Sequence, residues 1–155
     1  MGLVWSQVFY ITLLLATVLY AMYKGGAPER VVAVIMLTAT FATAALGMVP
    51  GVNFAKLELA IFVIDVVTLV ALAGVALTAA RLWPLLIAAL QLVAIACHIA
   101  ALLQVASLPW VYAFLLSVWA YPMLLILAIG TWFHSSRVSG TGEEQHWSSF
   151  NKKNS

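Results

Sequence analysis

Asp65 and His98 are the two side chains whose types and spacing could do proton chemistry within the apolar part of this chain. Each lies well inside a long apolar stretch, where an ionisable group is costly unless it faces protein or water. The two stretches turn around near residue 81, about 16 residues from each side chain, which places both about 12 Å from the outer surface. We therefore predict that Asp65 and His98 form an ion pair or a hydrogen bond.

Other polar side chains fall near the same depth. Gln91 precedes His98 by about seven residues, which puts both on the same helical face. Depth does not fix the rotation of a helix about its axis, so contact among the remaining residues is only a hypothesis. The predicted polar layer also includes Thr12, Thr40, Thr43 and Ser117.

Three roles are open for the Asp65–His98 pair. We favour an interhelical lock, since such hydrogen bonds stabilise membrane helices by about 0.6 kcal/mol on average. The second role is proton- or ion-linked, because buried acid and histidine pairs mark relays in pumps and transporters. The third is haem or metal ligation. It is the weakest, because His134 and His146 lie outside the apolar runs and Cys97 points about 100° away from its neighbour His98. We therefore expect no metal site and no cofactor.

Catalytic motifs are absent from the sequence. No serine follows the pattern of a nucleophile elbow, and Gly25-Gly26 is a turn rather than a phosphate-binding loop. The carboxylates of Glu143 and Glu144 lie in a polar tail, where water solvates them. We therefore expect a protein that is not an enzyme.

Composition identifies the solvent of this chain. Hydrophobic residues make up 65% of its 155 residues and charged residues 8%, whereas soluble domains are about 45–50% apolar and about 25% charged. A small soluble fold could not hide that much apolar surface, so the solvent is predicted to be lipid. The net charge of +2 forms no basic stripe, which argues against nucleic acid as a partner.

Five apolar runs are long enough to cross about 30 Å of hydrocarbon as helices. We predict an all-α integral membrane bundle over residues 1–133, followed by a polar tail over 134–155. Short links that carry Gly and Pro separate the runs and make successive helices antiparallel neighbours. The predicted helices span roughly 3–23, 31–49, 57–80, 83–105 and 109–133.

Lysine and arginine placement predicts the orientation. The positive-inside rule puts the side that is richer in these residues in the cytoplasm, with the N-terminus outside and the C-terminus inside. Lys56 is the only such residue on the outer side. The inner side holds Lys24, Arg30, Arg81, Arg137, Lys152 and Lys153.

Two further features indicate how the chain packs. Pro122, beside Tyr121, is expected to kink the fifth helix, because proline frees a carbonyl one turn earlier. The tail carries Trp147 and Phe150, which we expect to be its contacts with a partner protein.

Four short pieces of the sequence form a pattern: Arg81-Leu82-Trp83-Pro84-Leu85, Gln91-Leu92, His98 and the stretch 119–125. This pattern resembles a family of small, uncharacterised membrane proteins of alphaproteobacteria. The four pieces cover mainly the C-terminal two helices. The resemblance implies a multi-pass protein of the bacterial inner membrane, and it transfers no activity and no functional residues.

The expected function is that of an accessory or scaffolding subunit, because the short loops leave no soluble catalytic domain. Its expected partners are the lipid bilayer and other membrane subunits. One alternative is an oligomeric transporter or channel that is linked to protons or ions through Asp65 and His98. Another is a haem-binding redox subunit.

Overall fold

The computed structural model describes residues 2–50, 54–79, 81–102 and 118–141. Within these ranges the protein is all-α, with five helices and no strands. Four of the helices, α1 to α4, are long and apolar enough to cross a membrane. The helices are α1 (Gly2–Lys24), α2 (Ala27–Gly47), α3 (Phe54–Thr78), α4 (Trp83–Leu102) and α6 (Ala120–Thr141).

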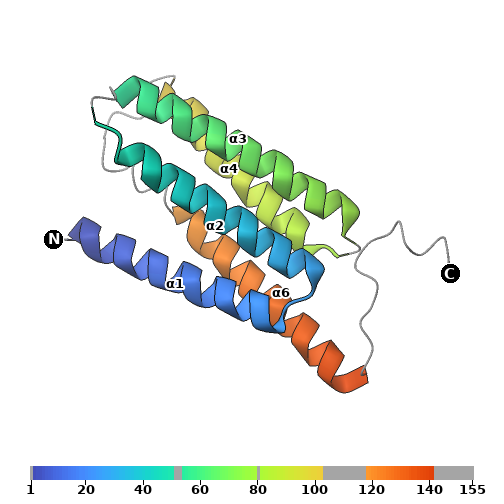
Figure 1. Ribbon diagram of the computed structural model, residues 1–155. Coiled ribbons are helices and arrows are strands. Elements are labelled where there is room, and N and C mark those ends of the chain that lie inside the picture. Colours follow the sequence, from blue (N-terminus) through green and yellow to red (C-terminus); the bar gives the residue numbers. More distant parts are fainter. Residues whose placement is uncertain (1, 51–53, 80, 103–117, 142–155) are drawn as a thin grey trace.

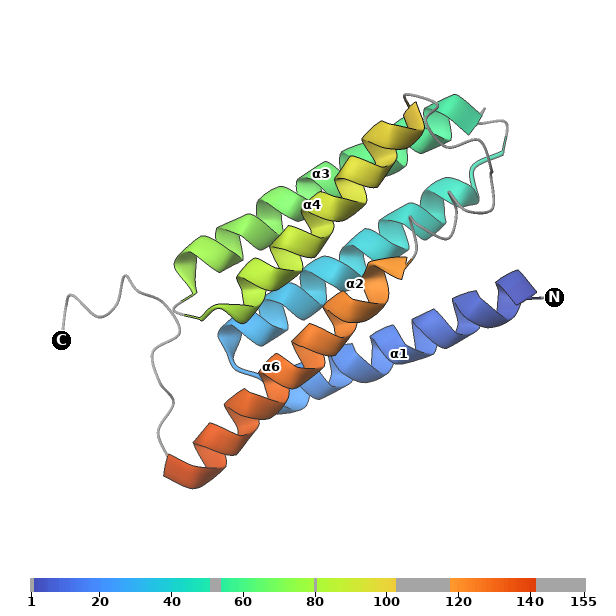
Figure 2. The ribbon, with the colours of Figure 1, turned by 180° about the vertical axis from the view of Figure 1, so that it is seen from behind.

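The helices form one elongated bundle with α2 near its middle (Figure 1). α3 and α4 pack as a hairpin on one side of α2, and α1 and α6 pack together on the other side (Figure 2). Contact between α4 and α6 closes the bundle. Gly25 and Arg81 lie in the two links at one end, which we name the Arg81 end. The opposite end, where α2 finishes and α3 begins, is the Lys56 end.

The interior is a single apolar core, and the outer faces are also apolar. Fully buried core side chains come from helices on both sides of α2, among them Leu14, Leu72 and Leu127. Large apolar side chains also cover the outside, such as Val70 and Leu77 on α3. A water-soluble protein would bury such faces, whereas lipid solvates them. This surface therefore fits the four candidate spans.

Two of the differences from the predicted helix boundaries affect the placement of polar residues. α2 begins at Ala27, four residues early, because Gly26 caps the helix and proline occupies its first turn. Glu29 is thus a buried residue of the helix instead of a residue in an exposed link. α6 continues to Thr141, so residues 134–141 of the predicted polar tail are helical.

The expected kink can be followed only in part. Trp119 adopts a turn just before α6, and Pro122 lies in the first turn of that helix. Proline is tolerated there because the amide it lacks has no partner within the helix. Residues 109–117 of the expected fifth run, and Trp147 and Phe150 of the tail, lie outside the described residues.

Candidate functional site

Asp65 and His98 are in contact, as predicted from their matched depth. His98 Nε2 lies 2.9 Å from Asp65 Oδ2. On the other side, Gln91 Nε2 donates to Asp65 Oδ1 at 2.9 Å and approaches the Asp65 main-chain oxygen at 3.3 Å. Both carboxylate oxygens are therefore held by donors on α4. We name these three residues the Asp65 centre.

The two members of the pair differ in burial. The His98 side chain is 5% exposed and the Asp65 side chain 23% exposed. Phe62 presents its ring edge-to-face to the imidazole, with ring centres 6.3 Å apart. His98 Nδ1 is buried and has no hydrogen-bond partner in the described part of the chain. Such an atom usually points to an unseen partner or to a functional role.

Two threonines of the predicted polar layer form hydrogen bonds with partners other than the Asp65 centre. Thr40 hydrogen-bonds the Tyr10 hydroxyl at 3.1 Å and the Met36 carbonyl at 2.9 Å, so it joins α1 to α2. Thr12 is exposed and bonds its own helix at Val8. Thr43 is half-buried, and Ser117 lies outside the described residues. The layer as a whole stays a prediction.

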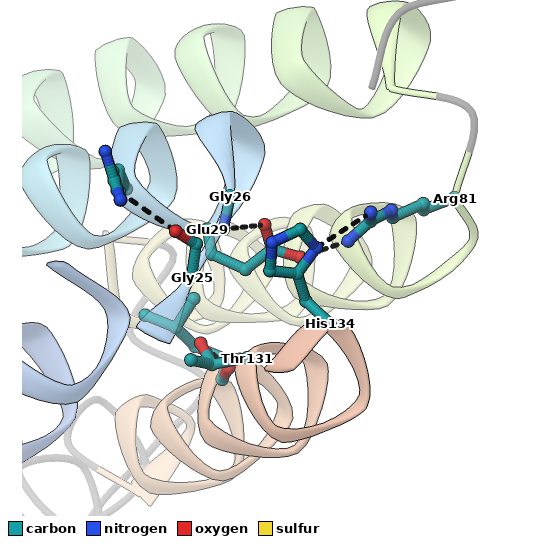
Figure 3. Close-up of polar contacts among 8 residues, drawn as sticks. Gly25, Gly26, Glu29, Arg81, Thr131 and His134 are labelled. Atoms are coloured by element: carbon teal, nitrogen blue, oxygen red, sulfur yellow. Dashed lines mark hydrogen bonds and ion pairs between the residues drawn. The ribbon is translucent and has the colours of Figure 1, made fainter. Parts of the chain in front are cut away.

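A second polar centre lies at the Arg81 end, and it contains the most deeply buried charge in the described helices. The Glu29 side chain is completely buried, and its Oε1 lies 2.5 Å from Arg81 Nη1. Its other oxygen, Oε2, accepts a hydrogen bond from the Gly26 amide at 3.0 Å, which caps α2. Figure 3 shows Glu29 between the Gly26 amide and the Arg81 guanidinium.

His134 of α6 completes this centre. Its Nδ1 lies 3.1 Å from Arg81 Nη2, and an arginine can only donate. Nδ1 must therefore accept, which makes His134 a neutral imidazole with its hydrogen on Nε2. A Cβ added to Gly26 would lie 2.8 Å from His134 Cε1, so only glycine lets the imidazole come this close. We name Glu29, Arg81 and His134 the Arg81 centre.

The Arg81 centre was not predicted from the sequence, because its three residues were expected in different parts of the chain. Glu29 and Arg81 were placed in links and His134 in the tail. A signal was available, since Leu127, Thr131 and His134 recur at helical spacing and all three are buried. Continuing the fifth helix by two turns would have pointed His134 at the links.

The two centres cannot act as one site. His98 lies 17 residues beyond Arg81 along the chain, and this separation corresponds to about 25 Å of helix. The imidazoles of His98 and His134 therefore cannot ligate one haem iron from both sides. No group of three or more metal-ligating side chains occurs within the described ranges either.

A groove of about 500 Å³ opens between α2 and α3 near the Lys56 end. Its walls are apolar apart from Lys56. Lys56 is the one lining residue that could bind a polar group, and no residue of either polar centre lines the groove. The lining residues are Ala42, Leu46, Lys56, Leu59, Ala60, Val63 and Ile64.

The chain is thus a helical bundle with four helices that are long and apolar enough to cross a membrane and with two polar centres between its helices. Comparison with family models, with curated proteins and with solved structures finds no match.

Proposed function

We propose that this chain is a non-enzymatic, multi-pass subunit of the bacterial inner membrane that packs against another membrane protein. In this proposal a fifth span includes the first part of α6, with the N-terminus outside and the C-terminus inside. The charges support this orientation. Lys24, Arg30, Arg81 and Arg137 belong to the Arg81 end, as the positive-inside rule requires of a cytoplasmic side.

The outward face of α3 carries the proposal. Among the described helices, α3 packs closely against α2 and α4 alone. Its opposite face is exposed from Leu59 to Leu77. That face is built mainly from β-branched valine and one glycine, whose added Cβ would meet nothing within 4 Å. β-branched side chains lose little rotamer freedom on packing, and glycine lets a second backbone approach closely. The face consists of Val63, Val67, Val70, Gly74 and Leu77.

The interior supports a packing role over a catalytic one. Glu29, Arg81 and His134 bind one another, and Asp65 is held by Gln91 and His98. Groups that are engaged in this way fix helices at defined distances. A rigid bundle with an apolar exterior suits a subunit that is recognised by shape.

Site-specific photo-crosslinking in native membranes tests the proposal. A photoreactive amino acid at Val67 or Val70 should yield one discrete protein adduct. The same probe at Leu19, an equally lipid-compatible site that is 57% exposed on α1, should yield lipid adducts only. If Val67 and Val70 also yield only lipid, the subunit proposal is wrong.

A second candidate is an oligomeric proton- or ion-linked transporter, and one observation favours it. The Asp65–His98 pair has a buried nitrogen without a described partner and a carboxylate that is partly exposed. Ion flux into liposomes should then fall in Asp65→Asn and His98→Ala, while Tyr10→Phe, which removes a hydrogen bond elsewhere in the bundle, leaves it unchanged. Flux that is equal in all four proteins would eliminate this candidate.

A further inference from the structure

An ionised carboxylate in the Asp65 centre would have no fixed cation among its described partners to balance it. Its described partners are an imidazole and a carboxamide, and neither bears a permanent charge. The nearest lysine on the same helix, Lys56, is nine residues away, which is about 13 Å along the axis. By contrast, the Glu29 carboxylate lies directly against an arginine. Only a proton can neutralise the Asp65 centre from within.

Other titratable groups around the pair do not replace that proton. Cys97 is the neighbour of His98 on α4, and Tyr121 near the start of α6 directs its hydroxyl to the Ser6 carbonyl. The charged residues of α2 lie at its start, and His134 and Arg137 of α6 lie toward its far end. Among the described residues, no cation therefore faces Asp65 from the helices packed around it.

We propose that the Asp65–His98 pair is a binding site for one exchangeable proton, whose binding places a hydrogen on Nδ1 of His98. This inference stands apart from the subunit role, since it concerns the chain alone.

Hydrogen-bond chemistry identifies Nδ1 as the atom that gains a hydrogen when the pair binds the proton. With no extra proton, the ionised carboxylate can only accept, so Nε2 holds the imidazole hydrogen and Nδ1 is a bare lone pair. The pair then has a net charge of −1. An added proton forms its bond with the lone pair of Nδ1. The product is an imidazolium beside a carboxylate, or, if the Nε2 hydrogen moves to Oδ2, a neutral imidazole beside a carboxylic acid.

Both neutral forms carry a hydrogen on Nδ1, and the form with a net charge of −1 does not. The state of this one nitrogen therefore reports whether the pair holds its proton. Burial favours the neutral forms, because a net charge is poorly solvated inside a membrane. Gln91 holds Oδ1 in every state, since its amide donates to a carboxylate and to a carboxylic acid oxygen alike. Partial exposure of Asp65 shows that the bundle does not seal the centre.

Nitrogen NMR of the full chain in lipid nanodiscs, with ¹⁵N-labelled histidine, tests the proposal. His98→Gln assigns the His98 signals. At neutral pH the native His98 should show a hydrogen directly bonded to Nδ1. His134 is the internal reference, because it accepts from Arg81 and should show a bare Nδ1. A bare Nδ1 on native His98 would overturn the proposal without the use of any variant.

Two further results separate proton binding from a fixed hydrogen bond. Transfer of the native chain to alkaline buffer should remove this hydrogen while the helices remain folded. In Asp65→Asn the amide oxygen accepts from Gln91 and the amide NH2 donates to Nε2, so Nδ1 of His98 should keep its hydrogen in the same alkaline buffer; Tyr10→Phe, the matched control, should lose it as the native chain does. If the hydrogen of the native chain persists up to the pH at which the chain unfolds, the proton is not exchangeable and the proposal fails.

Discussion

Glu29 and Arg81 should be energetically coupled, and their contact and burial allow an estimate of the coupling free energy. The carboxylate is completely buried and the Arg81 side chain is 12% exposed. Two charges about 4 Å apart attract by about 4 kcal/mol at an effective dielectric constant of about 20. Desolvation of the carboxylate offsets part of this attraction, so a pair removed as a whole costs little, whereas one orphaned partner costs about 3–5 kcal/mol.

A double-mutant cycle measures this coupling. Arg81→Met leaves a carboxylate with no access to water and should cost about 3–5 kcal/mol. Glu29→Gln should cost less, about 1–3 kcal/mol, because its amide oxygen still accepts from Gly26 and Arg81 keeps both His134 and some solvent. The double variant should be more stable than the sum of the two losses predicts, by about 2–4 kcal/mol.

Unfolding in mixed micelles, followed by tryptophan fluorescence, supplies the three free energies. Helix content in detergent, from circular dichroism, confirms that each variant inserts. Losses that add to within about 0.5 kcal/mol would mean that the two charges do not stabilise one another. The description of the Arg81 end as an electrostatic lock would then be wrong.

Glycine positions provide matched tests of the packing, with Gly47→Ala as the common control because its Cβ would meet nothing within 4 Å. Gly26→Ala should cost about 1–3 kcal/mol in the same unfolding assay, since the new methyl displaces His134; stability equal to the control would contradict the close approach. Gly130→Ala places a methyl 3.0 Å from the Trp83 ring and should cost about 1 kcal/mol or more. An unchanged tryptophan emission maximum in that variant would count against the contact.

The sequence predicted the helices and the Asp65–His98 contact because both depend on distance along the chain. Apolar length sets a span, and equal counts from one turn set equal depth. The contact also needed suitable rotation of α3 and α4, which depth alone does not specify. Because depth does not specify rotation, it also could not predict that Thr12 bonds Val8 and that Thr40 bonds Tyr10.

The Arg81 centre escaped prediction for a different physical reason. Charged residues beside Gly and Pro favour exposed links, and this preference hides a buried pair whose members are 52 residues apart. Glu29 is buried because one carboxylate both caps α2 and meets Arg81. The sequence near residue 26 indicates the cap, because Gly26 and Glu29 are only three residues apart. It does not indicate the cation, because Arg81 comes from the link between α3 and α4.

Charge balance separates the two centres in function. The Arg81 centre contains an acid, a permanent base and a neutral imidazole that accepts from the base, so it is neutral without any further proton. Nothing in that arrangement requires a change of protonation state, which is the property expected of a lock between α2, the α3–α4 link and α6. The Asp65 centre also joins two helices, α3 and α4, through hydrogen bonds, but it contains no arginine or lysine. An asparagine at residue 65 would hold Gln91 and His98 equally well without a charge, so the carboxylate adds nothing to a lock except the capacity to hold a proton.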